Sequence, residues 1–379
     1  MGLDPRSLLA GPRGRRLCLE LACRLDERIG LGVMQLGADL DTSAAIHSIL
    51  LFGAVDGTDT EDDNTGQDGR TPSGTIEELA QDLAELDLAV LDLTVPDLTT
   101  LDAASTGGDH QRGAHLLHRS LSASVEAAMY WQEPDGQDTL AALPEIREAM
   151  LPLAHRVAAA APVMGWDHPC ASQQWILRWS QPGSPDGSDL HRDVSRWAAG
   201  TREGEAAARR GQPRNARAAP SGSWWSIPLG LQQTVDRVPA GLDLVEDELG
   251  WEDAWVTPVH EPGRTLEITG AEDWIALCRK HPLEVTASRR HDWYRVTGRD
   301  GRWVVPDWEH VAETWDAVHL TVAGYLQAAT RTLEVDADTA SVIGGWDPGS
   351  TYWLSSTVPA ETGESQRWRR QDEGWVHAP

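Results

Sequence analysis

Residues 284–308 read EVTASRRHDWYRVTGRDGRWVVPDW and combine alternating apolar positions, a glycine-bearing turn, a basic cluster and several aromatic side chains. Residues 293–297 alternate in character, residues 298–301 read GRDG, and residues 303–305 return as an apolar run, which predicts a β-hairpin. The later stretches AVHLTVAGYL and SVIGGWDPGSTYWLSS supply further short strands. Short strands interspersed with a few helices predict an α+β fold with a mixed or antiparallel sheet in this half of the chain.

Composition divides the chain of 379 residues into two halves, because 13 of its 18 tryptophans lie beyond residue 220. The polar segment GQPRNARAAPSG is typical of a connection, so we expect a linker at about 200–220. The chain is also long for a single hydrophobic core. We therefore predict an acidic, mostly helical or mixed α+β domain at 1–219, with a disordered loop at about 54–74, and a Trp-rich α+β domain at 220–379.

Local patterns predict several individual elements. Five segments carry apolar side chains at helical spacing: 16–29, 75–86, 115–131, 144–161 and 190–210. In the second of them, Thr75 followed three residues later by Glu78 predicts a capping box. QQWILRW at 173–179 predicts a strand, and LDLAVLDLTV at 86–95 predicts an edge strand. AAIHSILLFG at 44–53 fits either a strand or a buried helix.

The net charge of −27 disfavours nucleic acid and anionic membranes as partners, because binding to phosphate needs a positive surface. The charge is uneven: residues 56–109 hold fifteen acids against one base, Arg70, whereas residues 279–302 hold seven bases against three acids. A positive patch on an acidic protein is a candidate anion site. The alternative is a solvated strand surface whose arginines balance nearby carboxylates.

The expected compartment follows from what the sequence does not contain. The start, MGLDPRSLLAGPRGRR, has no apolar core of the length of a signal peptide, and no run approaches the length of a membrane span. The four cysteines are scattered without a CxxC pair, which disfavours a zinc ribbon and a disulfide framework. We expect a cytoplasmic protein, with no membrane or nucleic-acid partner, and we predict no metal and no cofactor.

The sequence contains no GxxxxGK[ST], HExxH, GxSxG or GxGxxG motif, and with Lys280 as its single lysine it is not a P-loop NTPase. What remains is a cluster around residue 290. His291 beside Asp292 is the candidate acid/base pair. Guanidinium forks for an anion, aromatic walls and further polar groups form the candidate ligand site: Arg289, Arg290, Arg295, His319, Tyr325, Trp346, Asp347 and Trp353. The alternative is arginines stacked on tryptophans at a domain surface, with Asp347 only starting its turn.

Six blocks of the sequence resemble recurring blocks of a family of uncharacterised actinobacterial proteins: RRLCLELA, YWQEPDG, SGSWWSIP, TASRRHDWYRVTGRDGRWVVPDW, DAVHLTVAGYL and GWDPGSTYWL. That family has no established activity, so the resemblance implies a cytoplasmic setting and no catalytic residues. More distantly, a strand, a helix and a strand followed by WDAVHLT and GWDPGSTYW are similar to small ADP-ribosyltransferase-like toxin folds.

Two functions of different classes fit these patterns. In the first, the C-terminal domain binds a small anionic or nucleotide-like ligand in a cleft lined by Arg and Trp, and such a protein could be an ADP-ribosyltransferase-like enzyme. In the second, the chain is a non-catalytic acidic interaction or immunity-type protein, whose N-terminal surface masks a basic protein partner. The sequence leaves open whether the protein is an enzyme.

Overall fold

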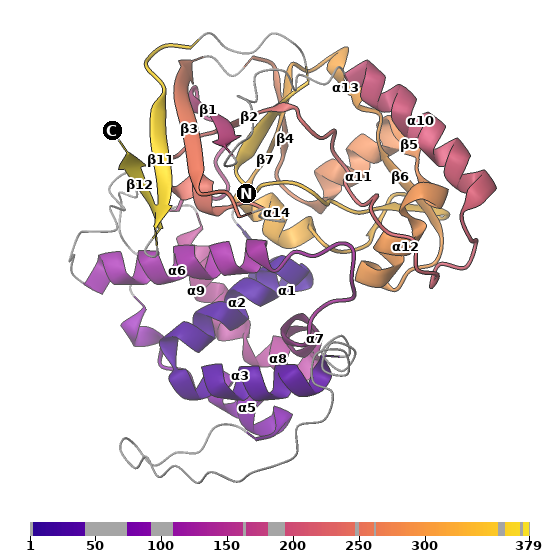
Figure 1. Cartoon of the computed structure of the whole chain (residues 1–379). Coiled ribbons are helices and arrows are strands. Elements are labelled where there is room, and N and C mark those ends of the chain that lie inside the picture. Colours follow the sequence, from indigo (N-terminus) through magenta and orange to yellow (C-terminus); the bar gives the residue numbers. More distant parts are fainter. Residues whose placement is uncertain are drawn as a thin grey trace, which may run out of the picture.

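The computed structural model describes these parts of the chain: 3–41, 74–91, 109–161, 164–180, 194–246, 250–260, 263–354, 361–371 and 374–378. The apolar run at 44–53, the loop expected at 54–74 apart from its last residue, and most of the acidic segment at 56–109 lie outside them. Within the described parts, no helix is both long and apolar enough to cross a membrane. The fold is α+β, with a group of helices below two sheets in Figure 1.

The lower group of helices is called the helical lobe here: α1 (Pro5–Ala10), α2 (Pro12–Leu25), α3 (Glu27–Leu40), α5 (Ile76–Ala84), α6 (Asp109–Glu126), α7 (Gly136–Ala142), α8 (Pro144–Ala149) and α9 (Leu151–Ala160). Thr75 and Glu78 form the predicted capping box at the start of α5. Pro152, in the first turn of α9, separates this helix from α8. A 3-10 turn at Leu88–Val90 replaces the first part of the expected edge strand.

The larger sheet has eight strands in the order β12-β11-β3-β1-β2-β10-β7-β4. Neighbouring strands are antiparallel except for β4 and β7, which are parallel, so the sheet is mixed as predicted. Its strands are β1 (Gln173–Ser180), β2 (Gln232–Val235), β3 (Asp253–His260), β4 (Thr265–Ile268), β7 (Ala317–Leu320), β10 (Ser350–Trp353), β11 (Gln366–Gln371) and β12 (Gly374–Ala378).

The smaller sheet has the order β5-β6-β9-β8 and lies beside the larger one. Its strands are β5 (Pro282–Glu284), β6 (Arg302–Pro306), β8 (Leu333–Glu334) and β9 (Thr339–Ser341). Five helices accompany the two sheets: α10 (Val194–Gly211), α11 (Ala271–Lys280), α12 (Thr286–Thr297), α13 (Trp308–Ala312) and α14 (Val322–Ala328). The two sheets and these helices form what we call the sheet lobe, together with the short 3-10 helix Ala240–Asp243.

The hairpin predicted around residues 293–305 is wrong, because residues 286–297 form helix α12 and only residues 302–306 form a strand. The helix ends at Gly298, which adopts the left-handed conformation with φ of +69° that glycine readily takes after a helix. The sequence signal failed because α12 buries polar side chains. Arg289, His291 and Asp292 all face inward, so no apolar stripe at helical spacing identifies the element.

Residues 200–211 of the linker expected at about 200–220 form the end of α10, and the chain beyond it packs against α12. Ala216 is buried there, and its carbonyl lies 3.2 Å from Nδ1 of His291. Strand β1, which precedes residue 220, pairs on one side with β3 and on the other with β2. The larger sheet therefore combines strands from both sides of the boundary that composition suggested.

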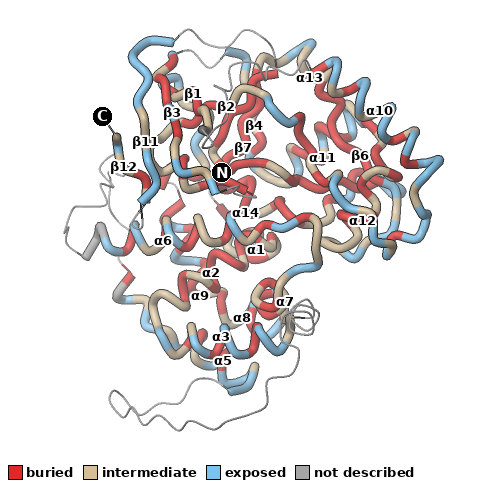
Figure 2. The backbone as a smooth tube through the Cα atoms, viewed as in Figure 1, coloured by how far each residue is buried: buried red, intermediate tan, exposed pale blue. Residues whose placement is uncertain are grey.

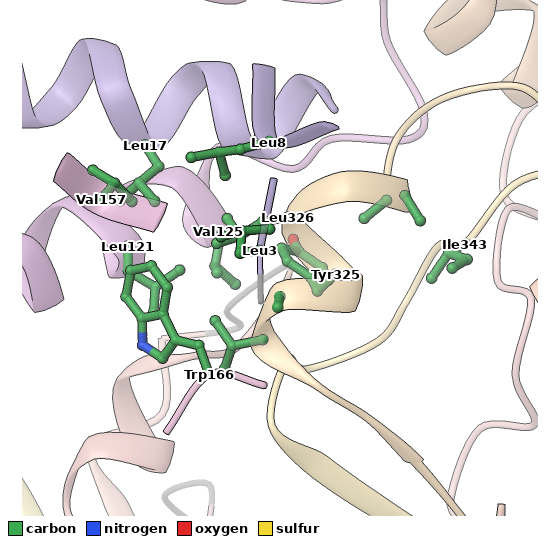
Figure 3. Close-up of a cluster of buried hydrophobic side chains, with 14 of the residues drawn as sticks. Leu3, Leu8, Leu17, Leu121, Val125, Val157, Trp166, Tyr325, Leu326 and Ile343 are labelled. Carbon is green, nitrogen blue, oxygen red and sulfur yellow. The ribbon is translucent and has the colours of Figure 1, made fainter. Parts of the chain in front are cut away.

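The two lobes share one hydrophobic core. Figure 3 shows side chains of the helical lobe, among them Leu8 and Leu17, gathered with Tyr325 and Leu326 of α14, and Figure 2 shows buried residues running through both lobes. The two lobes pack closely at Gly11, between α1 and α2, where an added Cβ atom would lie 2.0 Å from the carbonyl oxygen of Leu326. A residue with a side chain does not fit at that approach.

Candidate functional site

A cleft with a volume of about 600 Å³ lies between α10 and α12. Besides Arg196 and Trp197, its α10 side consists of small residues that recur on one face of the helix: Gly200, Thr201, Gly204, Ala207 and Ala208. A Cβ atom added to Gly200 or Gly204 would meet no other atom within 4 Å, so both glycines face open space. The sequence of α10 therefore forms a trough instead of a packed helix face.

Arg289 of α12 lines the opposite side of the cleft and is only 9% exposed. Its Nε donates a hydrogen bond to the carbonyl oxygen of Trp225 at 3.3 Å. No acid among the described residues forms an ion pair with Arg289, and burial lowers the pKa of its guanidinium to about 10. A buried guanidinium without a carboxylate is costly, and an anion bound in the cleft would offset that cost.

Two carboxylates have charges that act on Arg289, but both form hydrogen bonds with other groups. Glu205 of α10 accepts from the backbone N–H groups of Ala287 and Ser288 at 2.9 and 2.8 Å, and so caps the N-terminus of α12. Asp292 accepts from the backbone N–H groups of residues 222 and 223 at 3.0 and 3.1 Å, and from Nη1 of Arg295 at 2.7 Å. Neither acid lines the cleft, whose described lining includes two arginines, Arg196 and Arg289, and no acid.

The rest of the lining supplies hydrogen-bonding groups and one aromatic wall: Trp197, Gln212, Ser223 and Ser288. The side-chain oxygen of Gln212 is buried and has no hydrogen-bond partner among the described residues. A buried acceptor without a donor is uncommon in a folded protein. The cleft thus offers cations, hydroxyl groups and an indole to a small ligand.

The neighbours of Arg289 in the predicted basic cluster hold the chain between α10 and Trp224. Arg290 donates from Nη1 to the carbonyl oxygen of Pro213, and Arg295 donates from Nη2 to the carbonyl oxygens of residues 218–220. His291 is 2% exposed, its Nδ1 faces the carbonyl of Ala216, and its Nε2 has no partner in the described structure. No hydrogen bond joins Asp292 to His291 in the described structure, and the acid/base role of this pair stays a prediction.

Three other predicted residues gather around a group that sequence reasoning missed, the buried carboxyl group of Glu246. Tyr325 donates to its Oε1 at 2.7 Å, as does Tyr130 at the same distance. The backbone N–H groups of Gly345 and Trp346 donate to its Oε2 at 2.7 and 3.0 Å. The backbone N–H of Glu246 in turn donates to Oδ1 of Asp347 at 3.0 Å. Its position after the apolar pair Leu244–Val245 was the one local hint of burial.

Burial dominates the titration of this network. It raises the pKa of Glu246 to about 8, although hydrogen bonds from Tyr325, Tyr130 and the backbone of Trp346 oppose the shift, and it raises the pKa of Asp347 to about 6. Gln233 donates to Oδ2 of Asp347 at 2.7 Å. These groups have hydrogen-bond partners and do not line the cleft between α10 and α12. The network therefore connects the two lobes as a polar part of the core.

His319 and Trp353, the remaining predicted residues, lie on one face of the larger sheet. Nδ1 of His319 is 2.7 Å from Oε2 of Glu267 on the neighbouring strand, and Nε1 of Trp353 donates to the hydroxyl of Thr234 at 3.1 Å. The backbone N–H of Cys170 donates to Oε1 of the same Glu267 at 2.9 Å. Burial raises the pKa of the Cys170 thiol, which disfavours the reactive thiolate.

The predicted site residues therefore divide among three places, and Arg289 alone of them lines the cleft. Among the described residues, no group of three or more His, Cys, Asp or Glu side chains is arranged to hold a metal ion. No protein-family model, no curated protein and no solved structure matches this chain.

Proposed function

We propose that the cleft between α10 and α12 binds a small anionic ligand, with Arg289 as the group that receives the negative charge. The observation that supports this proposal is that Arg289 is buried, has no acidic partner among the described residues, and lines a cleft with no acid in its described lining. Guanidinium groups in such surroundings bind carboxylate and phosphate groups through paired hydrogen bonds. Arg196 adds a second positive charge to the lining.

The shape and chemistry of the cleft favour a nucleotide-like ligand over a bare inorganic ion. A volume of about 600 Å³ falls in the range of small-molecule sites and exceeds what a phosphate ion fills. The indole of Trp197 offers a surface for a base, and the hydroxyl groups of Ser223 and Ser288 can hydrogen-bond polar groups of the ligand. An ADP-ribosyltransferase-like enzyme would bind NAD in this cleft, and we propose that activity for the chain. The cytoplasmic setting is likewise part of the proposal.

Calorimetric titration of the full chain tests the proposal with NAD, ADP, AMP and ribose 5-phosphate, and with adenosine as the uncharged comparison. We expect saturable binding of at least one phosphate and not of adenosine. Arg289→Met should weaken that binding by about tenfold or more, because a charge-assisted hydrogen bond is lost. Arg210→Met, which removes an exposed arginine of α10 outside the cleft, is the matched control and should bind like the parent chain.

Two results would overturn the proposal. The first is that none of the phosphate compounds shows saturable binding up to about 10 mM, because a Kd above that value is too weak to indicate a specific site. The second is binding that survives unchanged in Arg289→Met. The acidic-partner function would then be the better candidate. It remains a prediction, since most of the acidic segment at 56–109 lies outside the described residues.

A further inference from the structure

A second cavity, with a volume of about 370 Å³, lies where the helical lobe meets the sheet lobe. The helical lobe contributes Pro12, Ala142 and the residue after α7, Leu143, while Val296 of α12 and Thr330 come from the sheet lobe. The lining combines apolar residues with a similar number of polar and charged ones, and most of its surface is apolar, which is typical of pockets that hold small organic molecules. A ligand in this cavity would contact both lobes at once.

Arg15 of α2 lines this cavity, and its surroundings resemble those of Arg289. Its Nη1 donates to the carbonyl oxygens of Leu9 and Ala10 at 3.2 and 3.0 Å, at the end of α1. Its Nε is buried and has no hydrogen-bond partner in the described structure, and no described acid forms an ion pair with it. Burial lowers the pKa of Arg15 to about 10, and the positive charge of Arg147 acts in the same direction. Arg15 is therefore a mostly buried cation without an ion pair in the described structure, although the charge of Asp138 opposes the lowering of its pKa.

The acids in the same wall all have interaction partners of their own. Asp138 forms ion pairs with Arg13 and Arg16, and Asp135 pairs with Arg16 at 2.9 Å while it caps the start of α7. Glu133, which also lines the cavity, has an interaction partner as well. These acids leave Arg15 without a counterion, but they repel a ligand of high negative charge. The wall therefore favours a monoanion over a phosphate.

We propose that this cavity binds the carboxylate of a small apolar acid. The Arg15 guanidinium receives the carboxylate, and the apolar walls of both lobes enclose the body of the ligand. The cavity volume suits an aromatic or short aliphatic acid. This site is separate from the cleft between α10 and α12, and the inference does not depend on the function proposed for that cleft.

Titration of the full chain with benzoate, 3-phenylpropionate and octanoate tests the inference, with benzamide as the uncharged isostere of benzoate and acetate as the ligand without an apolar body. We expect at least one of the three larger acids to bind, and benzamide and acetate to bind about tenfold more weakly or not at all. Binding should also raise the melting temperature, by an amount that grows with the logarithm of the ligand concentration above the Kd, because the ligand binds the folded chain and not the unfolded one.

Two variants locate the site. Arg15→Met removes the cation, and Ala142→Phe fills the cavity from the exposed end of α7 while Arg15 and its contacts with α1 stay in place. Each should weaken binding by about tenfold or more, and if Arg15→Met fails to fold, Ala142→Phe decides. Ala199→Phe, at an exposed position of α10 away from this cavity, and Arg289→Met should bind like the parent chain.

The inference is overturned by any of three results: equal affinity for benzoate and benzamide, unchanged binding in Ala142→Phe, or no saturable binding of the three larger acids up to about 10 mM. Loss of carboxylate binding in Arg289→Met would also overturn it, because it would place these acids in the other cleft.

Discussion

The hydroxyl of Tyr130, just beyond α6, lies 2.7 Å from Oε1 of Glu246, which is 116 residues away in the sequence. The same hydroxyl lies 2.9 Å from the carbonyl oxygen of Ile343. One hydroxyl proton cannot serve both acceptors at full strength. If Tyr130 donates to Ile343, then a protonated Glu246 can donate to Tyr130, and every partner is satisfied. The geometry therefore agrees with the raised pKa of Glu246, about 8.

The stability of the fold should fall as pH rises through the neutral range. Glu246 has a pKa of 4.5 when solvated and about 8 in the fold, so the folded state holds a proton that the unfolded state has released. This contribution is complete below about pH 4.5 and is lost as the pH rises to about 8, at up to about 1.4 kcal/mol per pH unit. Asp347, raised from 3.8 to about 6, adds the same trend at lower pH. Urea unfolding at pH 5 and pH 8.5 measures the difference.

Glu246→Gln should flatten this pH dependence. The amide oxygen can accept from the backbone N–H groups of residues 345 and 346, and the amide nitrogen can donate to Tyr130 and Tyr325, so the variant keeps most of the network. We expect a loss of no more than about 1–2 kcal/mol at pH 5 and no loss, or a gain, at pH 8.5. Parallel pH profiles for the parent chain and Glu246→Gln would show that Glu246 is ionised in the fold.

The close approach of the lobes predicts a large effect from one methyl group. In Gly11→Ala the added Cβ would lie 2.0 Å from the carbonyl oxygen of Leu326, so α14 must shift away from the start of α2. We expect a destabilisation of about 1–3 kcal/mol or more by denaturant unfolding. Gly30→Ala, inside α3 with its nearest neighbour at 3.4 Å, is the control and should be neutral or stabilising. Equal effects of the two substitutions would mean that the join is loose.

The elements that the sequence predicted correctly depend on near neighbours. Thr75 and Glu78 form a capping box within one turn, and β1 alternates Trp175, Leu177 and Trp179 within seven residues. Helix α12 was missed because its inward face carries charged groups, whose partners lie about 70 to 80 residues earlier in the chain. Long-range pairing of this kind leaves no periodic signal in the local sequence.

The same limit applies to the candidate site. The positive patch pointed to the correct helix, since Arg289 lines the cleft, but it could not separate Arg289 from its neighbours. The trough on α10 was missed because glycine, with its low helix propensity, and alanine, with its high one, give no local sign of a binding surface. Their role depends on α12 standing opposite, a relation that only the folded chain contains.

Adjacent arginines of α12 should differ in their effect on ligand binding. Sequence reasoning gave Arg289 and Arg290 the same role, but Arg290 contacts the carbonyl of Pro213 and does not line the cleft. Arg289→Met should lower the affinity for the bound phosphate by about tenfold or more, whereas Arg290→Met should change it by less than about threefold, through the long-range field alone. Calorimetry at low and at high salt separates the two contributions. A larger effect of Arg290→Met would place the ligand outside the cleft.

Filling the trough on α10 should separate binding from stability. In Gly204→Leu the new side chain enters the cleft, where a Cβ atom meets no neighbour within 4 Å, and leucine favours the helix by close to 1 kcal/mol over glycine. We therefore expect the melting temperature to stay level or rise while affinity for the phosphate ligand falls by about tenfold or more. Gly211→Leu, at the end of α10 and outside the cleft, is the matched control and should retain binding. If Gly204→Leu bound the phosphate ligand with unchanged affinity, the ligand would not occupy the trough. A misfolded variant could not produce that result, since misfolding would lower the affinity.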